Sequence, residues 1–188
     1  LGYITIVKKE NLQKYINKNK SRAFFSTEWL KPGRDLYAPI TMIEPMTRQR
    51  SLRLGYDMLL EESRREAILQ AIQSTSPTIS KPLKSLMTRD QSAMASLLLL
   101  IPYYKTIETP LTPEERIKQV QGLIYIPMRM RNFFEATLGP PNSRNERVNF
   151  KISYLDSNSQ SEIPLYERFD QTNPDQADMR FARSQIID

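Results

Sequence analysis

The chain has 188 residues, enough for one large domain or two small ones that share an interface. It has 27 Lys and Arg against 21 Asp and Glu, a formal net charge of +6, but basic and acidic residues are interleaved, which favours a solvated surface and no nucleic-acid partner. The sequence has no Cys and no His, which excludes disulfides, thiolate catalysis and zinc sites with nitrogen or sulfur ligands. We therefore expect no catalytic residues, no metal and no cofactor, and do not expect the domain to be an enzyme.

The first residues predict a strand followed by a short helix. The segment from Leu1 to Val7 is rich in apolar and β-branched residues, which favours a strand. After it, Leu12, Tyr15 and Ile16 recur at helical spacing within a polar stretch. We expect an amphipathic helix from about Glu10 to Lys18, with one face buried.

A turn and a second strand follow. Pro32-Gly33 suits the central positions of a type II turn, and Leu36 to Ile43 predicts a strand, so we expect a β-hairpin whose first arm contains Trp29-Leu30. Pro39 lacks a backbone donor, which places the second strand at a sheet edge or gives it a bulge. Glu44-Pro45 ends that strand.

The middle of the chain predicts a helix and a pair of strands. Ser63 and Glu66 form a capping-box pattern, which predicts a helix from Arg64 to about Gln73. The runs Thr78 to Leu86 and Ala93 to Tyr104 are expected to pair, the second being apolar enough for the interior of a sheet. The buried stripe of the helix is expected to contain Ile68, Ala71 and Ile72.

Beyond these strands the pattern alternates again. Thr112-Pro113-Glu114-Glu115 predicts a capped short helix that ends near Gly122, and Leu123 to Met128 predicts a strand. Asn132 to Leu138 predicts a helical segment with Phe133 and Phe134 directed inward.

Gly139-Pro140-Pro141 is the best internal boundary, because it stops the preceding helical segment. After it, the apolar residues Val148, Phe150, Ile152 and Tyr154 alternate with polar residues, which predicts a half-buried strand. The polar tail from Ile163 to Asp188 is expected to add one or two strands. The whole order predicts an antiparallel α+β fold.

Several of these segments together resemble the CHASE family of extracytoplasmic sensor domains. The likeness begins with Tyr37 to Pro45 and continues through Leu54 to Met58, Leu100 to Tyr104 and Thr112 to Arg116, in the order and approximate spacing of the family. It covers about Leu1 to Leu138. The resemblance implies two PAS-like subdomains: a membrane-distal ligand-binding unit over residues 1–138, and the remainder of a membrane-proximal unit over residues 139–188. We expect the family's long N-terminal stalk helix to be missing.

The resemblance also implies a function. A small organic ligand would bind outside the cytoplasm, at the periplasmic face of the inner membrane, to a receptor held by flanking membrane spans that this sequence does not contain. The receptor would be a homodimer with a cytoplasmic histidine kinase or diguanylate cyclase as output domain. The alternatives are a ligand-free structural, dimerisation or partner-docking module, favoured if no cavity lies near Thr41 and Ser74, and an enzyme that pairs Glu44 with Asp57 across an open cleft.

In the family, the membrane-distal unit holds the ligand between its sheet and adjoining loops, as in the plant cytokinin receptors. An acidic residue at the end of the Tyr-Ala-Pro strand holds the adenine-like ring there, and Glu44 is displaced from that position, which argues against cytokinin. Strand alternation puts Thr41 and Ile43 on one face, taken as the pocket side, and Ile40 and Met42 on the other. The implied ligand-binding residues, in a small and mostly apolar site, are Tyr37, Thr41, Ile43, Glu44, Ser74, Leu83, Leu98, Leu100 and Gly122.

For some of these residues a second role stays open. Thr41 and Ile43 also suit core packing, and Glu44 also suits a surface position before a proline. Asp57 is expected to be a turn or helix-entry residue that stabilises the structure.

Overall fold

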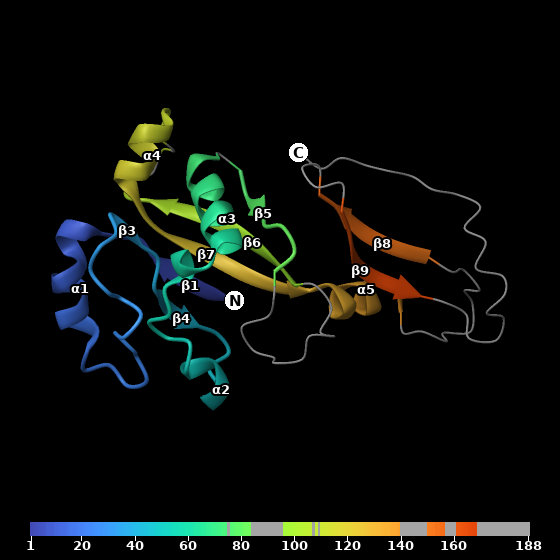
Figure 1. The fold of residues 1–188 in the computed structure, drawn as a ribbon, viewed down its shortest axis with the longest axis horizontal. Helices are drawn as coiled ribbons and strands as arrows, with labels where there is room; N and C mark the ends of the chain where they lie inside the picture. The colour runs from blue at the N-terminus through green and yellow to red at the C-terminus, as the bar shows by residue number, and fades with distance from the viewer. Residues whose placement is uncertain are drawn as a thin grey trace.

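The computed structural model describes residues 1–74, 76–83, 96–106, 108, 110–139, 150–156 and 161–168. These residues form a mixed α+β structure around a five-stranded antiparallel sheet (Figure 1). In spatial order its strands are β4 (Ile40–Ile43), β1 (Gly2–Thr5), β7 (Val120–Arg129), β6 (Ser96–Tyr104) and β5 (Thr78–Ile79). Two small sheets pair β2 (Val7–Lys8) with β3 (Leu36–Tyr37), and β8 (Phe150–Leu155) with β9 (Glu162–Arg168).

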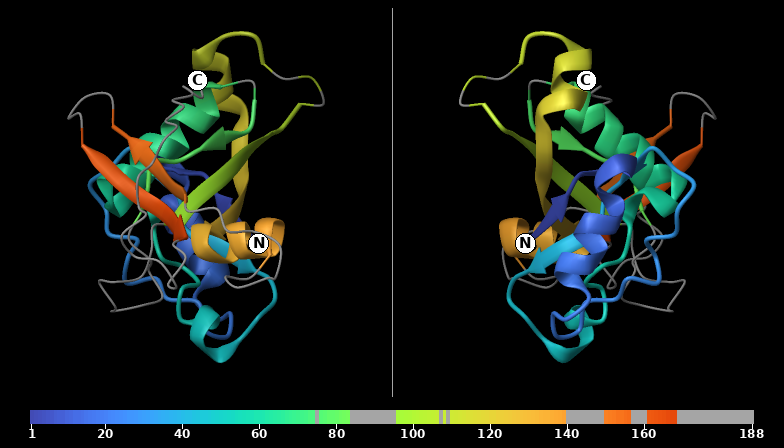
Figure 2. Two further views of the ribbon diagram at one scale, coloured as in Figure 1. Left: turned by 90° about the vertical axis from the view of Figure 1, so that its right-hand side faces the viewer. Right: turned by 90° about the vertical axis from the view of Figure 1, so that its left-hand side faces the viewer.

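The helices connect these strands and cover the sheet. Figure 2 shows α3 against one face of β6 and β7. The helical segments are η1 (Lys9–Asn11), α1 (Leu12–Asn19), α2 (Arg48–Ser51), η2 (Met58–Leu60), α3 (Glu62–Gln73), α4 (Pro113–Gln119) and α5 (Met130–Leu138). Within the described residues, no helix has the length and apolar character needed to span a membrane.

The predicted hairpin around Pro32-Gly33 is wrong, although Gly33 does have the positive φ of 126° that a glycine turn allows. The two parts of the predicted second strand pair with the N-terminal strands instead: β3 with β2, and β4 with β1. Pairing with the first strands lets β4 bury Ile40 and Ile43 in the core. The prediction that Pro39 interrupts an edge strand is confirmed, since it separates β3 from β4, and β4 lies at the edge of the sheet.

The segments Tyr37–Pro39 and Gly55–Asp57, which both carry the family resemblance, meet each other in the structure. Asp57 is fully buried, and its Oδ1 accepts hydrogen bonds from the backbone amides of Ala38 at 2.9 Å and Leu59 at 3.0 Å. Its Oδ2 forms an ion pair with Arg34. The expectation that Asp57 is a helix-entry residue with a structural role is therefore confirmed, because it caps η2 and ties this segment to β3.

Helix α3 confirms the predicted position and buried stripe, since Ile68, Ala71 and Ile72 are fully buried. The predicted capping box is wrong, because the helix begins two residues earlier than expected, at Glu62. Glu61 is its N-cap, and Ser63 lies within the first turn, so the Ser63 hydroxyl is not at the N-cap position. By contrast, the capping box of α4 is confirmed, with reciprocal hydrogen bonds between Thr112 and Glu115.

The predicted pairing of the two middle strands is confirmed for β5 and β6, whose partners include Thr78 with Leu100. Residues 84–86 of the first predicted run and residues 93–95 of the second lie outside the described residues. β6 is an interior strand, as expected, and pairs with β7 along its length.

The C-terminal hairpin of β8 and β9 packs against α5. The ring of Phe134 lies 5.2 Å from the ring of Tyr166, which is almost completely buried. Phe133 is not buried in the core as predicted, since its side chain is 49% exposed and lies at the cavity described below. Gly139 ends α5 with a φ of 80°. Val148, at the start of the predicted strand, and most of the predicted tail from Ile163 to Asp188 lie outside the described residues.

Candidate functional site

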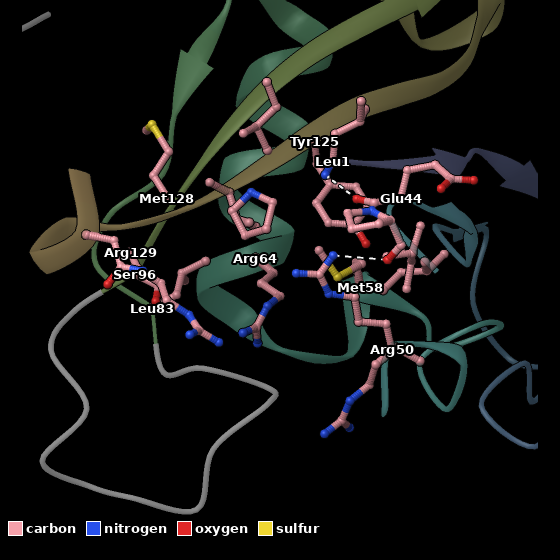
Figure 3. Close-up of a pocket in the computed structure, with 18 of the residues that line it drawn as sticks. Leu1, Glu44, Arg50, Met58, Arg64, Leu83, Ser96, Tyr125, Met128 and Arg129 are labelled. Carbon is pink, nitrogen blue, oxygen red and sulfur yellow. Dashed lines mark hydrogen bonds between the residues drawn. The ribbon is translucent and has the colours of Figure 1, made fainter. Parts of the chain in front are cut away.

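A cavity of about 550 Å³ opens between the sheet, the segment that follows β4, and helices α3 and α5 (Figure 3). Its volume is in the range typical of small-molecule sites, about 300–1,000 Å³. Most of the side chains that line it are apolar, and the polar ones include several arginines. The lining residues are Leu1, Ile40, Ile43, Glu44, Pro45, Arg50, Arg53, Met58, Arg64, Leu83, Ser96, Leu98, Tyr125, Ile126, Pro127, Met128, Arg129, Asn132 and Phe133.

The apolar wall depends on a bulge in β4. Tyr3 pairs with Met42 and Ile4 pairs with Ile40, so Thr41 is the extra residue between the two pairs. The bulge breaks strict alternation and turns both Ile40 and Ile43 toward the cavity. The predicted faces are therefore wrong for Thr41 and Ile40, and correct for Ile43 and Met42.

Thr41 belongs to a polar cluster away from the cavity. Its hydroxyl shares hydrogen bonds with the hydroxyls of Thr5 at 2.6 Å and Tyr15 at 2.9 Å, and donates to the carbonyl of Pro39 at 3.2 Å. Burial raises the pKa of Tyr15, and the two threonine hydroxyls lower it in part. These contacts tie α1 to the edge of the sheet, which is a structural role.

The structure brings together four of the predicted site residues: Ile43, Glu44, Leu83 and Leu98 line the cavity. Glu44 is at its rim with an exposed side chain, and Figure 3 shows its carboxylate directed away from Arg64 and Arg129. Its backbone carbonyl accepts from the nitrogen of Leu1 at 2.8 Å. Asp57 is buried elsewhere, so Glu44 and Asp57 do not form the carboxylate pair of the enzyme alternative.

The other predicted site residues lie outside the cavity. Tyr37 is fully buried, with Arg34 4.6 Å above its ring, and Leu100 is fully buried in the core. Ser74 ends α3, where its hydroxyl accepts from the amide of Ser76 at 3.1 Å. Gly122 lets β1 and β7 approach, because a Cβ there would lie 2.2 Å from the carbonyl oxygen of Ile4.

The predicted set contains none of the cavity's arginines. Arg50 extends from α2, Arg64 from α3 and Arg129 from the end of β7 (Figure 3). Arg64 is only 3% exposed, yet it follows the helical spacing of Ile68 and Ala71 on the buried stripe of α3. An arginine on an otherwise apolar helix stripe is a signal that sequence reasoning could have used.

Arg64 is held in place by its neighbours. It forms an ion pair with Glu61 and a hydrogen bond with Tyr56. Burial lowers the pKa of Arg64, while Tyr56 raises it in part. Arg50 is held differently, because its Nη1 donates to the carbonyl of Pro45 at 3.0 Å.

Tyr125 closes the cavity beside β1. It pairs with Gly2 across the strands, and a Cβ on Gly2 would lie 2.3 Å from the Tyr125 ring, so the missing side chain makes room for the ring. Burial raises the pKa of Tyr125 to about 12, while the charge of Arg50 lowers it in part. The phenol is therefore a neutral hydrogen-bonding group at ordinary pH.

Among the described residues, no group of three or more His, Cys, Asp or Glu side chains lies close enough together to hold a metal ion. The lining instead offers apolar surface, guanidinium groups, a phenol, an amide, the hydroxyl of Ser96 and the carboxylate of Glu44 at the rim. Such a set suits the binding and orientation of a small molecule.

An antiparallel α+β domain with a mostly apolar cavity beside its sheet has the features typical of a small-molecule binding domain. The family model of the CHASE domain matches residues 1–166, and the chain belongs to this family. CHASE domains are extracytoplasmic domains of receptors that sense small ligands, and they are not catalytic. Comparison with curated proteins gives no match.

Proposed function

We propose that this domain binds a small organic ligand in the cavity between β4, α3 and β7, and that ligand binding controls a cytoplasmic histidine kinase or diguanylate cyclase through flanking membrane spans. The receptor would act as a homodimer on the periplasmic face of the inner membrane. The observation that carries this proposal is the cavity of about 550 Å³, whose wall combines apolar residues with a few polar groups.

Within this proposal, the ligand contacts four of the residues expected from the sequence, Ile43, Glu44, Leu83 and Leu98, because they line the cavity. Tyr37, Thr41, Ser74, Leu100 and Gly122 would support the site from outside it. Met58 and Tyr125 join the ligand contacts from the centre of the wall.

We further propose that residues 1–138 form the membrane-distal PAS-like unit and residues 139–188 belong to the membrane-proximal one. Helix α5 supports this division, because it contacts both sides: Asn132 and Phe133 line the cavity, and Phe134 packs on Tyr166 of β9. A ligand that moves α5 would change how the hairpin of β8 and β9 is held. Only a ligand with different affinities for two such arrangements shifts their populations.

A thermal-shift screen of small metabolites tests ligand binding. A ligand at 100 times its dissociation constant stabilises the folded state by about 2.7 kcal/mol. The substitution Ser96→Trp, at the cavity wall, is expected to abolish the shift by filling the cavity, whereas Ser76→Trp on the exposed surface is expected to preserve it. Equal shifts in both variants would place the ligand elsewhere, and Glu44→Ala tests the carboxylate in the same way.

One observation favours the second candidate, a module for dimerisation or partner docking. On the sheet face opposite α3, the paired residues Met42, Tyr3, Ile124 and Ile101 form an apolar row across four strands. Met42 is 45% and Ile124 38% exposed. Two measurements test this candidate. It is removed if the purified domain sediments as a monomer at high concentration and captures no partner from an extract of membranes that contain the receptor.

A further inference from the structure

The cavity gathers positive charge from segments that are far apart in the sequence. Arg50 and Arg53 follow β4, Arg64 comes from α3, and Arg129 comes from the last residue of β7. Figure 3 shows Arg50, Arg64 and Arg129 extending into the region between β7 and α2. Like charges repel, so four arginines around one small cavity need a reason, and one of them, Arg64, also loses hydration because it is buried. Arg50 and Arg53 are half-buried, and Arg129 is exposed.

The acidic partners account for only part of this charge. Arg64 pairs with Glu61, which neutralises one of the four arginines. Glu44 is the only acidic side chain among the described residues that line the cavity, and its carboxylate is exposed at the rim. Arg53, like Arg64, has a partner. Arg50 and Arg129 then bring two guanidinium charges against the one carboxylate of Glu44, an excess of about one positive charge at neutral pH among the described lining residues.

The apolar half of the wall lies next to this charge. Ile43, Met58, Leu83 and Leu98 are less than 10% exposed, and they form a surface that a hydrocarbon or ring can cover. The phenol of Tyr125 and the amide of Asn132 add uncharged hydrogen-bonding groups. A ligand that matches both halves has an oxyanion at one end and an apolar body at the other.

We propose that the ligand of this sensor is an anion, with a carboxylate or phosphate group bound by Arg50 and Arg129 and an apolar body bound against Met58 and Leu98. This inference rests on the proposed function and specifies its ligand class. Guanidinium groups suit both anions, because their N–H donors match the oxygen spacing of carboxylate and phosphate. Arg64 would orient the anion from a position fixed by Glu61.

The experiment uses matched pairs of probes with isothermal calorimetry on the purified protein. Octanoate is compared with octanamide, phenylacetate with phenylacetamide, and octyl phosphate with octanol. We expect the charged member of at least one pair to bind at least about tenfold more tightly than its neutral partner, since a hydrogen bond to a charged group contributes that much or more. Carboxylate and phosphate probes separate the two sources of the oxyanion.

Three variants assign the effect to the cavity. Arg129→Gln and Arg50→Gln are each expected to weaken binding of the charged probe by about tenfold and to leave the neutral probe unchanged. Arg65→Gln is the matched control, because Arg65 is exposed on the same helix as Arg64 and lies outside the cavity. Arg64 is left intact, since removing a buried ion-pair partner threatens the fold itself.

The outcomes separate this inference from the proposed function. Neutral probes that bind as tightly as their anions, with Ser96→Trp abolishing both, would overturn the anionic ligand and leave ligand sensing standing. Equal loss in Arg65→Gln and Arg129→Gln would reduce the effect to general surface charge and overturn the inference. If no probe of either charge binds, the inference fails, and the metabolite screen then decides the proposed function separately.

Discussion

Replacing Asp57 with alanine is expected to destabilise the protein more than most single substitutions. Its carboxylate is fully buried and accepts two backbone amide hydrogen bonds, from Ala38 and Leu59, while it pairs with Arg34. Alanine leaves both amides and the guanidinium without their acceptor. Breaking a buried pair in this way costs about 3–5 kcal/mol.

The structure places the expected cost at the low end of that range. The Arg34 side chain is 32% exposed, so water screens part of its charge when its partner is removed. We therefore expect a loss of about 3 kcal/mol for Asp57→Ala. In a domain of this size 1 kcal/mol corresponds to about 2–4 °C, so the melting temperature is expected to fall by about 6–12 °C.

The assay is chemical and thermal unfolding of a double-mutant cycle. It compares Asp57→Ala, Arg34→Ala and the double variant with the natural protein. Because the two side chains are in contact, we expect a coupling free energy of about 1 kcal/mol or more. If the free-energy losses of the two single variants add to that of the double variant within about 0.3–0.5 kcal/mol, the ion pair has no stabilising role. A loss below about 1 kcal/mol for Asp57→Ala would also refute the role of its backbone hydrogen bonds.

Four further substitutions test local features. Gly55→Ala puts a Cβ 1.8 Å from the carbonyl oxygen of Ser26 at a φ of 86°, so we expect a loss above about 1 kcal/mol in urea unfolding, and a smaller one for Gly33→Ala, where no described atom lies within 4 Å. Thr112→Ala removes a helix cap and is expected to cost about 1 kcal/mol, which an unchanged melting temperature would contradict. The pKa of Tyr125 is raised from 10 to about 12, so the neutral phenol contributes about 2–3 kcal/mol to the free energy of unfolding, complete below pH 10 and lost as pH rises through 12. The free energy of unfolding of Tyr125→Phe is expected to fall less steeply with pH over this range. Equal slopes for the variant and the natural protein in urea unfolding would disprove the contribution.

Features set by neighbouring residues were predictable from the sequence. The α4 capping box needs only Thr112 and Glu115 three residues apart, and its reciprocal hydrogen bonds form as expected. The interruption at Pro39 follows from its missing amide hydrogen. Such local chemistry does not depend on how the rest of the chain folds.

Features set by distant partners were not predictable in the same way. The strand after Gly33 pairs with β1 and β2 rather than with its sequence neighbour, because pairing there buries Ile40 and Ile43 in the common core. The bulge at Thr41 depends on the register with β1 and redirects the side chains around it. Strand alternation placed Thr41 on the same face as Ile43, and the family resemblance assigned that face to the pocket. The Thr41 hydroxyl instead forms a hydrogen bond with Tyr15.

The segments that carry the family resemblance explain why the family was identified and the cavity arginines were missed. Tyr37 to Pro39 and Gly55 to Asp57 join through the Asp57 carboxylate and through backbone hydrogen bonds, such as that from the amide of Ile40 to the carbonyl of Tyr56 at 2.9 Å. They build the scaffold that carries β4 and leads into α3. The charge that would select a ligand comes instead from Arg50, Arg64 and Arg129, outside those segments. In this protein the family resemblance identifies the scaffold, and the ligand class has to be inferred from the side chains placed on it.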